Sequence, residues 1–148
     1  MDSTLLGRSY PPTDPYLVGR EKVREFAHAV FSTDPLSLDP EAARAAGYAD
    51  VVAPPTFAVV LQELTLRQLL ADPTAGIELS HVVHGDQTFA YSRPIVAGDE
   101  LTAVFTVTGL RELGGNAMIT ADSAVTDASG AHVVTMTSTL VVRGEAAA

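Results

Sequence analysis

The fold is decided by one stretch, residues 54–73, with the sequence PPTFAVVLQELTLRQLLADP. Apolar side chains surround its first turns almost completely and leave a narrow polar stripe, formed by Gln62, Glu63, Arg67 and Gln68. A helix that is apolar nearly all round is normally buried. The stretch therefore predicts a buried central helix of about four turns, which ends at Asp72-Pro73.

The chain after this helix is predicted to form strands. Residues 77–83 and 87–91 indicate one strand that bends near Gly85, and apolar and polar residues then alternate along 101–108 and 119–126. A last strand is predicted from His132 to Val142. Turn residues separate the three long strands at 114–116 and 127–130, which is typical of an antiparallel meander. One buried helix before such a meander indicates an α+β fold in which the sheet wraps around the helix.

The chain before the central helix is predicted to be less regular. Pro11, Pro12 and Pro15 favour an arm over residues 1–15 that runs extended on the surface. A helix is expected from Arg20 to Val30, a loop over 31–39, and a short helix over 41–46 that Asp39-Pro40 begins. With residues 144–148 as a tail, we expect residues 1–148 to form a single domain.

The composition excludes several classes of function. The chain has 148 residues, with 9 basic and 18 acidic residues and a formal net charge of −9, so neither nucleic acid nor a membrane surface is an expected partner. There is no Cys, which excludes disulfides and Cys-based zinc sites. His81 and His84, three apart in a predicted strand, point to opposite faces and do not predict a metal pair. No signal peptide or membrane span is recognisable, so we expect a cytoplasmic protein.

Several motifs together resemble the MaoC-type hot-dog hydratases and dehydratases. The pattern of that family is Asp-x-Asn-Pro-Leu-His, followed by x-Asp-Pro-Glu, an Ala-rich turn and a Gly. This chain has Asp34-Pro35-Leu36, Asp39-Pro40-Glu41-Ala42-Ala43 and Ala45-Ala46-Gly47 in those places. The segments 52–57 and 87–99 resemble the approach to the family's helix and its bent second strand. The resemblance covers residues 16–143 and implies a hot-dog fold that dimerises into one continuous sheet.

The same resemblance predicts a degenerate site. In the family, the Asp and the His form a catalytic dyad that adds water to, or removes it from, an acyl thioester. Those two positions fall at Ser32 and Ser37, and a serine does not titrate near neutral pH. We therefore expect no catalytic residue in this chain. The fallback candidates are Asp34 in the same loop, Glu63 on the helix, and His84 near the predicted acyl channel.

Thioester binding is expected to survive the loss of the dyad. In the family the start of the central helix points its backbone N–H groups at the thioester carbonyl, where they stabilise an enolate. The residues that the resemblance assigns to binding are Pro55, Thr56, Phe57, Val60, His84, Gly85 and Gln87. No metal and no cofactor are expected.

The resemblance implies a function of the following kind. The chain is most similar to the non-catalytic subunits of two-chain (3R)-hydroxyacyl-carrier-protein dehydratases, in which the other chain brings the dyad. The expected partners are an acyl-CoA or an acyl carrier protein thioester, and a second hot-dog chain in a homodimer or heterodimer. Two alternatives stay open: a homodimeric (R)-specific enoyl-thioester hydratase that uses other residues, and a non-enzymatic thioester-binding scaffold.

Overall fold

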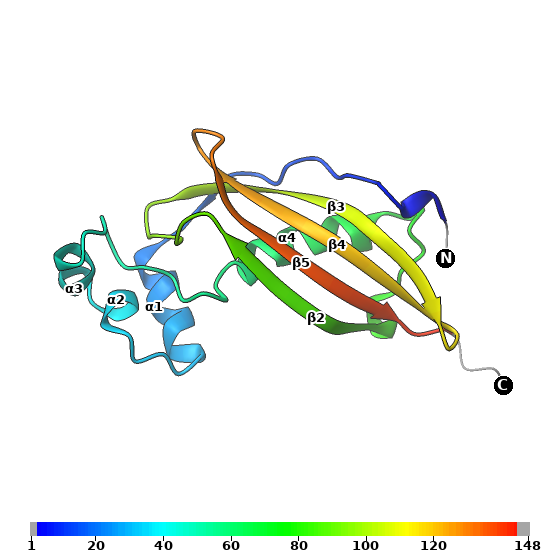
Figure 1. Cartoon of the computed structure of the whole chain (residues 1–148), viewed down its shortest axis with the longest axis horizontal. Coiled ribbons are helices and arrows are strands. Elements are labelled where there is room, and N and C mark those ends of the chain that lie inside the picture. Colours follow the sequence, from blue (N-terminus) through cyan, green and yellow to red (C-terminus); the bar gives the residue numbers. More distant parts are fainter. Residues whose placement is uncertain (1–2, 145–148) are drawn as a thin grey trace.

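The computed structural model describes residues 3–144 and has one antiparallel sheet curled around a central helix (Figure 1). The strands are β1 (Tyr16–Leu17), β2 (Val82–Tyr91), β3 (Glu100–Leu113), β4 (Asn116–Asp127) and β5 (His132–Val142), in the order β1-β3-β4-β5-β2. The helices are α1 (Arg20–Ala29), α2 (Pro35–Leu38), α3 (Pro40–Ala45) and α4 (Val59–Ala71), with short 3-10 turns η1 (Ser3–Leu5) and η2 (Leu79–His81). The predicted α+β class and the sheet wrapped around one helix are confirmed.

The strands β3, β4 and β5 form the predicted antiparallel meander. Leu113 pairs with Asn116 across a two-residue turn, Gly114-Gly115, in which both residues have positive φ angles of 59° and 79°. Glycine adopts this conformation without steric cost, and the twist of such a turn matches that of the flanking strands. Alternate residues of the three strands therefore face α4 and are buried, while a threonine-rich set faces away from it.

The core lies between α4 and the concave face of the sheet. Two apolar clusters fill it, one around Phe57 and Leu61 at the start of α4 and one around Leu69 and Phe105 at its end. All four of these side chains are fully buried. Burial of this kind contributes about 25 cal/mol per Å² of apolar surface, so the two clusters account for the position of α4.

One assignment on α4 is wrong. Gln62 was expected on the solvated stripe with Glu63 and Arg67, but it is only 5% exposed, whereas Glu63 and Arg67 are exposed. Within residues 3–144 its Oε1 atom has no hydrogen-bond partner. Helical periodicity gives the direction of a side chain but does not show how much of the helix surface the rest of the fold covers.

The N-terminal arm is part of the fold and does not merely lie on its surface. It begins with η1, whose Leu5 is fully buried, and its backbone then bonds to β3 at Gly7, Tyr10 and Thr13. Arg8 and Tyr10 reach the end of α4, where both donate to the Asp72 carboxylate, at 2.7 and 2.8 Å. The prolines prevent a helix, as predicted, but they leave enough N–H groups for pairing with β3.

Two other boundaries differ from the prediction. Residues 35–38 form the single turn α2, because Asp34 accepts a hydrogen bond from the Leu36 N–H at 2.9 Å and Pro35 suits the first helical position. Residues 77–81 are a loop and the turn η2, and β2 begins only at Val82. Ile77 is buried in the apolar cluster around Leu69 and Phe105, so its apolar character reflects packing and not strand pairing.

β2 forms one of the two edges of the sheet, opposite β1. It is one strand, as predicted, with a register shift between His84 and Asp86 that leaves Gly85 as the bulge. Among the described residues β2 pairs only with β5, so its other side has no strand partner. No helix within residues 3–144 is long and apolar enough to cross a membrane.

Candidate functional site

A cleft with a volume of about 460 Å³ is lined by residues around α2 and in the approach to α4. Figure 1 shows α1, α2 and α3 gathered at this end of the molecule. Three segments line the cleft: the loop before α2 together with α2 itself, the approach to α4, and the chain that follows β2. The lining residues are Ser32, Asp34, Ser37, Val52, Ala53, Pro54, Pro55, Tyr91, Ser92, Arg93, Pro94 and Ile95. Backbone bonds from Val52 to Leu36 and from Ala53 to Ile95, both 2.8 Å, hold the three segments together.

The two serines at the expected dyad positions both face this cleft, and Asp34 lies between them. Ser37 is 4% exposed and donates its hydroxyl to the Val52 carbonyl at 2.6 Å. Ser32 is half-buried, and its hydroxyl accepts from the Asp34 N–H at 3.3 Å. The Asp34 carboxylate caps α2, so the only carboxylate among the lining residues already has a structural partner.

A second hollow, of about 550 Å³, lies between the start of α4 and the free edge of the sheet. It is lined by Thr56, Val59, His84, Gly85, Asp86, Gln87 and Phe89. His84 and Gln87 are inward-facing residues of β2, and their side chains meet at 3.0 Å between Nε2 and Oε1. The predicted binding residues are therefore divided: Pro55 belongs to the cleft, and Thr56, His84, Gly85 and Gln87 belong to the hollow.

Tyr91 stands between the cleft and the hollow. Its hydroxyl donates to the Pro55 carbonyl at 2.6 Å, and its ring stacks on Phe89 with a centroid distance of 6.4 Å. Burial of the phenol raises the pKa of Tyr91 to about 12, because an apolar environment disfavours the phenolate. The hydroxyl is therefore a neutral donor throughout the physiological pH range.

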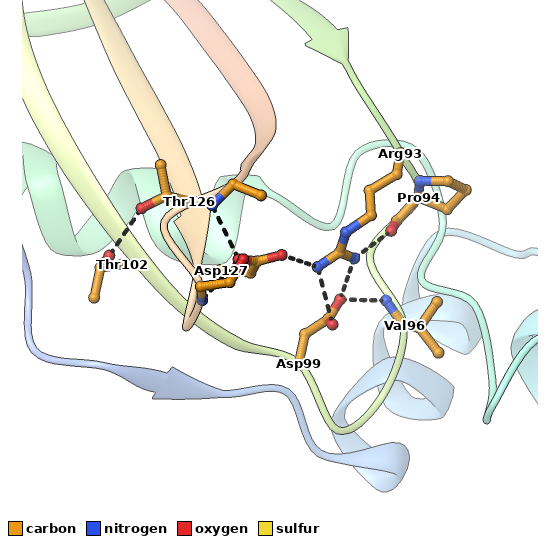
Figure 2. Close-up of polar contacts among 9 residues, drawn as sticks. Arg93, Pro94, Val96, Asp99, Thr102, Thr126 and Asp127 are labelled. Atoms are coloured by element: carbon orange, nitrogen blue, oxygen red, sulfur yellow. Dashed lines mark hydrogen bonds and ion pairs between the residues drawn. The ribbon is translucent and has the colours of Figure 1, made fainter.

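Arg93 lines the cleft with its side chain already engaged (Figure 2). Its guanidinium donates to both oxygens of Asp99, at 2.8 and 3.1 Å, and to Asp127 at 3.2 Å. These bonds raise the pKa of Arg93, while the Ser129 hydroxyl and Arg93 lower the pKa of Asp127 to about 2. The cluster ties the chain that leaves β2 to the β4–β5 hairpin, so Arg93 fixes the shape of the cleft.

The start of α4 differs in detail from the expected anion-binding helix end. The Phe57 N–H is used in a turn, where it donates to the Pro54 carbonyl at 2.9 Å, and the Phe57 side chain is fully buried. Phe57 and Val60 line neither the cleft nor the hollow. The N–H groups of Thr56 and Ala58 have no acceptor within residues 3–144, but Ala58 is fully buried and lines neither space, so of the two it is the Thr56 N–H that borders the hollow.

The remaining sequence candidate lies outside both spaces. Glu63 is exposed on α4 and pairs with Arg67 at 2.6 Å, one helical turn away. Within residues 3–144 no three or more His, Asp or Glu side chains gather as a metal site would require. Tyr91 and Arg93 were missed as site residues, although the period of two along Gln87, Phe89 and Tyr91 places Tyr91 on the inward face.

A five-stranded sheet curled around one helix, with a cleft beside the start of that helix, defines the class of hot-dog proteins. Residues 4–136 match the family described as the FAS1-like, dehydratase domain region, and the chain belongs to that family. It is 65% identical over 145 residues to a UPF0336 protein of Leifsonia xyli subsp. xyli, covering 98% of this chain and 97% of that relative.

Solved structures agree with this assignment. The C-terminally truncated HadBC (3R-hydroxyacyl-ACP dehydratase) complex from Mycobacterium tuberculosis has a similar chain, with a TM-score of 0.80 and 31% identity over 93% of this chain and 96% of that one. A MaoC-like dehydratase has a TM-score of 0.84 and 35% identity, covering 95% of this chain but 43% of that longer one. The resemblance drawn from the motifs is confirmed at the level of family and fold.

Proposed function

We propose that this chain is the acyl-thioester-binding, non-catalytic subunit of a two-chain (3R)-hydroxyacyl-thioester dehydratase or enoyl hydratase. One observation carries the proposal: Ser32 and Ser37, at the family's dyad positions, face the same cleft. Addition of water to an enoyl thioester needs a group that accepts a proton and a partner that holds the water. Neither serine titrates near neutral pH, and the Asp34 carboxylate is occupied as a helix cap.

The edge strand supports the two-chain assembly. β2 has ten residues with no Lys and no Pro, and its bulge at Gly85 leaves the regular part of the free edge at residues 86–91. Its unpaired N–H and C=O groups suit a second hot-dog chain, which would continue the sheet. HadBC, at 31% identity, is itself a complex. In our proposal the partner brings the Asp/His dyad, and this chain contributes the walls of the acyl site.

The charges near the cleft indicate what the partner must supply. An acyl carrier protein or coenzyme A is anionic, and a chain with a net charge of −9 repels both at long range. Every cation of α1 and α3, and Arg93, has a carboxylate within 4.0 Å; the pairs are Arg20–Asp50, Lys22–Glu25, Arg24–Glu21, Arg44–Glu41 and Arg93–Asp99. The proposal therefore assigns the basic docking surface for the carrier to the partner chain.

The geometry gives little support to the homodimeric hydratase. Its three candidates do not meet: Asp34 lines the cleft, His84 lines the hollow, and Glu63 is exposed in an ion pair. A general base that acts without a partner to hold the water gives only a small part of the rate of the complete pair, because such groups act as a unit.

The test restores the dyad. The double variant Ser32→Asp, Ser37→His is expected to hydrate trans-2-octenoyl-CoA at least about 100-fold faster than the wild-type chain, which should be nearly inert alone. The matched control, Ser32→Asn with Ser37→Gln, has similar size and polarity without groups that titrate near neutral pH, and should stay inert. Each single variant, Ser32→Asp or Ser37→His, should give far less than the double variant.

Two results would contradict the proposal. Rapid turnover by the wild-type chain alone would show that it has catalytic groups of its own. A double variant that folds and binds octanoyl-CoA, yet does not hydrate the enoyl thioester, would show that Ser32 and Ser37 are not the dyad positions. Circular dichroism and calorimetric titration supply the folding and binding controls.

A further inference from the structure

The cleft and the hollow share one wall. Pro55 lines the cleft, and the next residue, Thr56, lines the hollow. On the facing strand, Tyr91 lines the cleft, and Phe89, two residues earlier on the same face of β2, lines the hollow. The hydrogen bond between the Tyr91 hydroxyl and the Pro55 carbonyl therefore spans the boundary between the two spaces.

This wall is weaker than the structure around it. Its polar contact is one neutral hydrogen bond of 2.6 Å, from a residue that is 36% exposed and whose ring stacks on Phe89. Within residues 3–144, β2 is held by β5 on one side only, so Tyr91 lies on an edge strand of the sheet. Rotamer changes of exposed side chains are fast compared with ligand binding. By contrast, the other side of the cleft is held by Arg93 and its two carboxylates.

Both spaces suit an alkyl chain. Apolar residues make up much of the cleft lining, including Val52, Ala53 and Ile95, and the hollow adds Val59 and Phe89. Each volume, about 460 and 550 Å³, lies within the usual range for small-molecule sites. Joined, they would hold a much longer chain than either does separately.

We propose that Tyr91 is a latch that sets the length of acyl chain the site accepts. With the bond to Pro55 closed, a short acyl chain fits in the cleft; a long one must break the bond and extend past the ring into the hollow. This inference rests on the proposed thioester-binding function and adds the residue that determines its chain-length preference.

The test compares saturated thioesters, which cannot be hydrated. Affinities for butyryl-CoA and for palmitoyl-CoA, below its micellar concentration, are measured by calorimetry with the chain in the assembly in which it purifies. Tyr91→Phe keeps the ring and removes the latch bond. It should raise the affinity for palmitoyl-CoA relative to butyryl-CoA about fivefold, which corresponds to one typical hydrogen bond.

A matched control separates the latch from the general loss of a phenol. Tyr10→Phe also removes one tyrosine hydrogen bond, to Asp72 at 2.8 Å, but at the other end of α4. It should leave the ratio of the two affinities as in the wild type. A change of the ratio in Tyr10→Phe as large as that in Tyr91→Phe would overturn the latch.

A second variant tests the hollow directly. Val59→Trp narrows the hollow and should lower the affinity for palmitoyl-CoA relative to butyryl-CoA, and it should cancel the gain when combined with Tyr91→Phe. The chain has no other Trp, so the indole fluorescence should respond to palmitoyl-CoA and not to butyryl-CoA.

The outcomes distinguish the two proposals. If Tyr91→Phe and the wild type bind both thioesters with the same ratio, the latch is overturned and thioester binding stands. If the wild type binds neither thioester, the proposed function is overturned, and the latch with it.

Discussion

The two ends of α4 are held in different ways. At the C-terminal end the Asp72 carboxylate accepts hydrogen bonds from Arg8, Tyr10 and Thr74, which link the helix to the N-terminal arm. At the N-terminal end Ala58 provides no side-chain cap, and the neutral bond from Tyr91 to Pro55 joins the approach to the helix to the edge strand.

The two ends of α4 therefore differ in the kind of contact that holds them. Charged and multiple contacts fix the end that lies far from the cleft. The end beside the cleft is held by an apolar cluster from within and by weak polar contacts from outside. Segments that must adjust to a ligand are drawn from the less stable parts of a protein. Both ends of α4 are packed in apolar clusters, and in our proposal only the contact between Tyr91 and Pro55 opens for a long acyl chain.

The largest expected loss of stability comes from substitutions in the apolar clusters at the two ends of α4. Phe57→Ala and Phe105→Ala each remove a fully buried ring that packs edge-to-face on a neighbour, Phe26 or Tyr10. Each should lower the free energy of unfolding by about 3–5 kcal/mol, measured by urea denaturation. At temperatures where both remain folded, only Phe57→Ala should weaken the binding of octanoyl-CoA. Equal losses of binding in both variants would remove the distinction between the two ends.

A smaller effect is expected from Asp72→Asn. Hydrogen bonds from Thr74, Tyr10 and Arg8 hold the pKa of Asp72 well below its ordinary value of 3.8. A carboxyl group that is more acidic when folded contributes stability above pH 3.8, and that stability is lost as the pH falls toward the folded pKa. The variant should therefore melt at a lower temperature at pH 7 and lose less stability between pH 5 and pH 2.

The control for Asp72→Asn is Glu63→Gln. It removes the charge of a carboxylate from an exposed ion pair on the same helix, where the expected change is within about 0.5 kcal/mol. Thermal melts of both variants across this pH range make the comparison. If Asp72→Asn lowers the melting temperature no more than Glu63→Gln does, and its stability depends on acid pH as in the wild type, the Asp72 contacts do not anchor the C-terminal end of α4.

The smallest effect is expected from Tyr91→Phe, measured as stability without ligand. Loss of the single bond to Pro55 should lower the free energy of unfolding by only about 0.5–1 kcal/mol. Urea denaturation with and without palmitoyl-CoA provides the measurement. A loss as large as that of Phe57→Ala would show that Tyr91 is a structural support of the N-terminal end and would contradict its role as an adjustable contact.

Most elements followed from local patterns, and the misses have local causes. Asp34-Pro35 carries the same capping signal as Asp39-Pro40, which predicts a helix, but the run between Pro35 and Asp39 is short enough to be read as a loop. Ile77 is apolar because it packs under the end of α4, and a pattern of apolar residues does not distinguish that from pairing in a strand. Gln62 is buried although it belongs to the polar stripe, because helical period gives the direction of a side chain but not how much of the helix surface the fold covers.

The sequence by itself determined the α+β class, the central helix and the antiparallel meander, because hydrophobic period and turn chemistry are local properties of the chain. It also predicts that Ser32 and Ser37 stand at the family's dyad positions. Only the tertiary structure showed that the predicted binding residues divide between two spaces, that Arg93 is occupied by Asp99 and Asp127, and that Tyr91 meets Pro55. The partners in these contacts lie 6, 34 and 36 positions apart. The two longer contacts depend on how the sheet curls around α4, and local sequence does not encode that curvature.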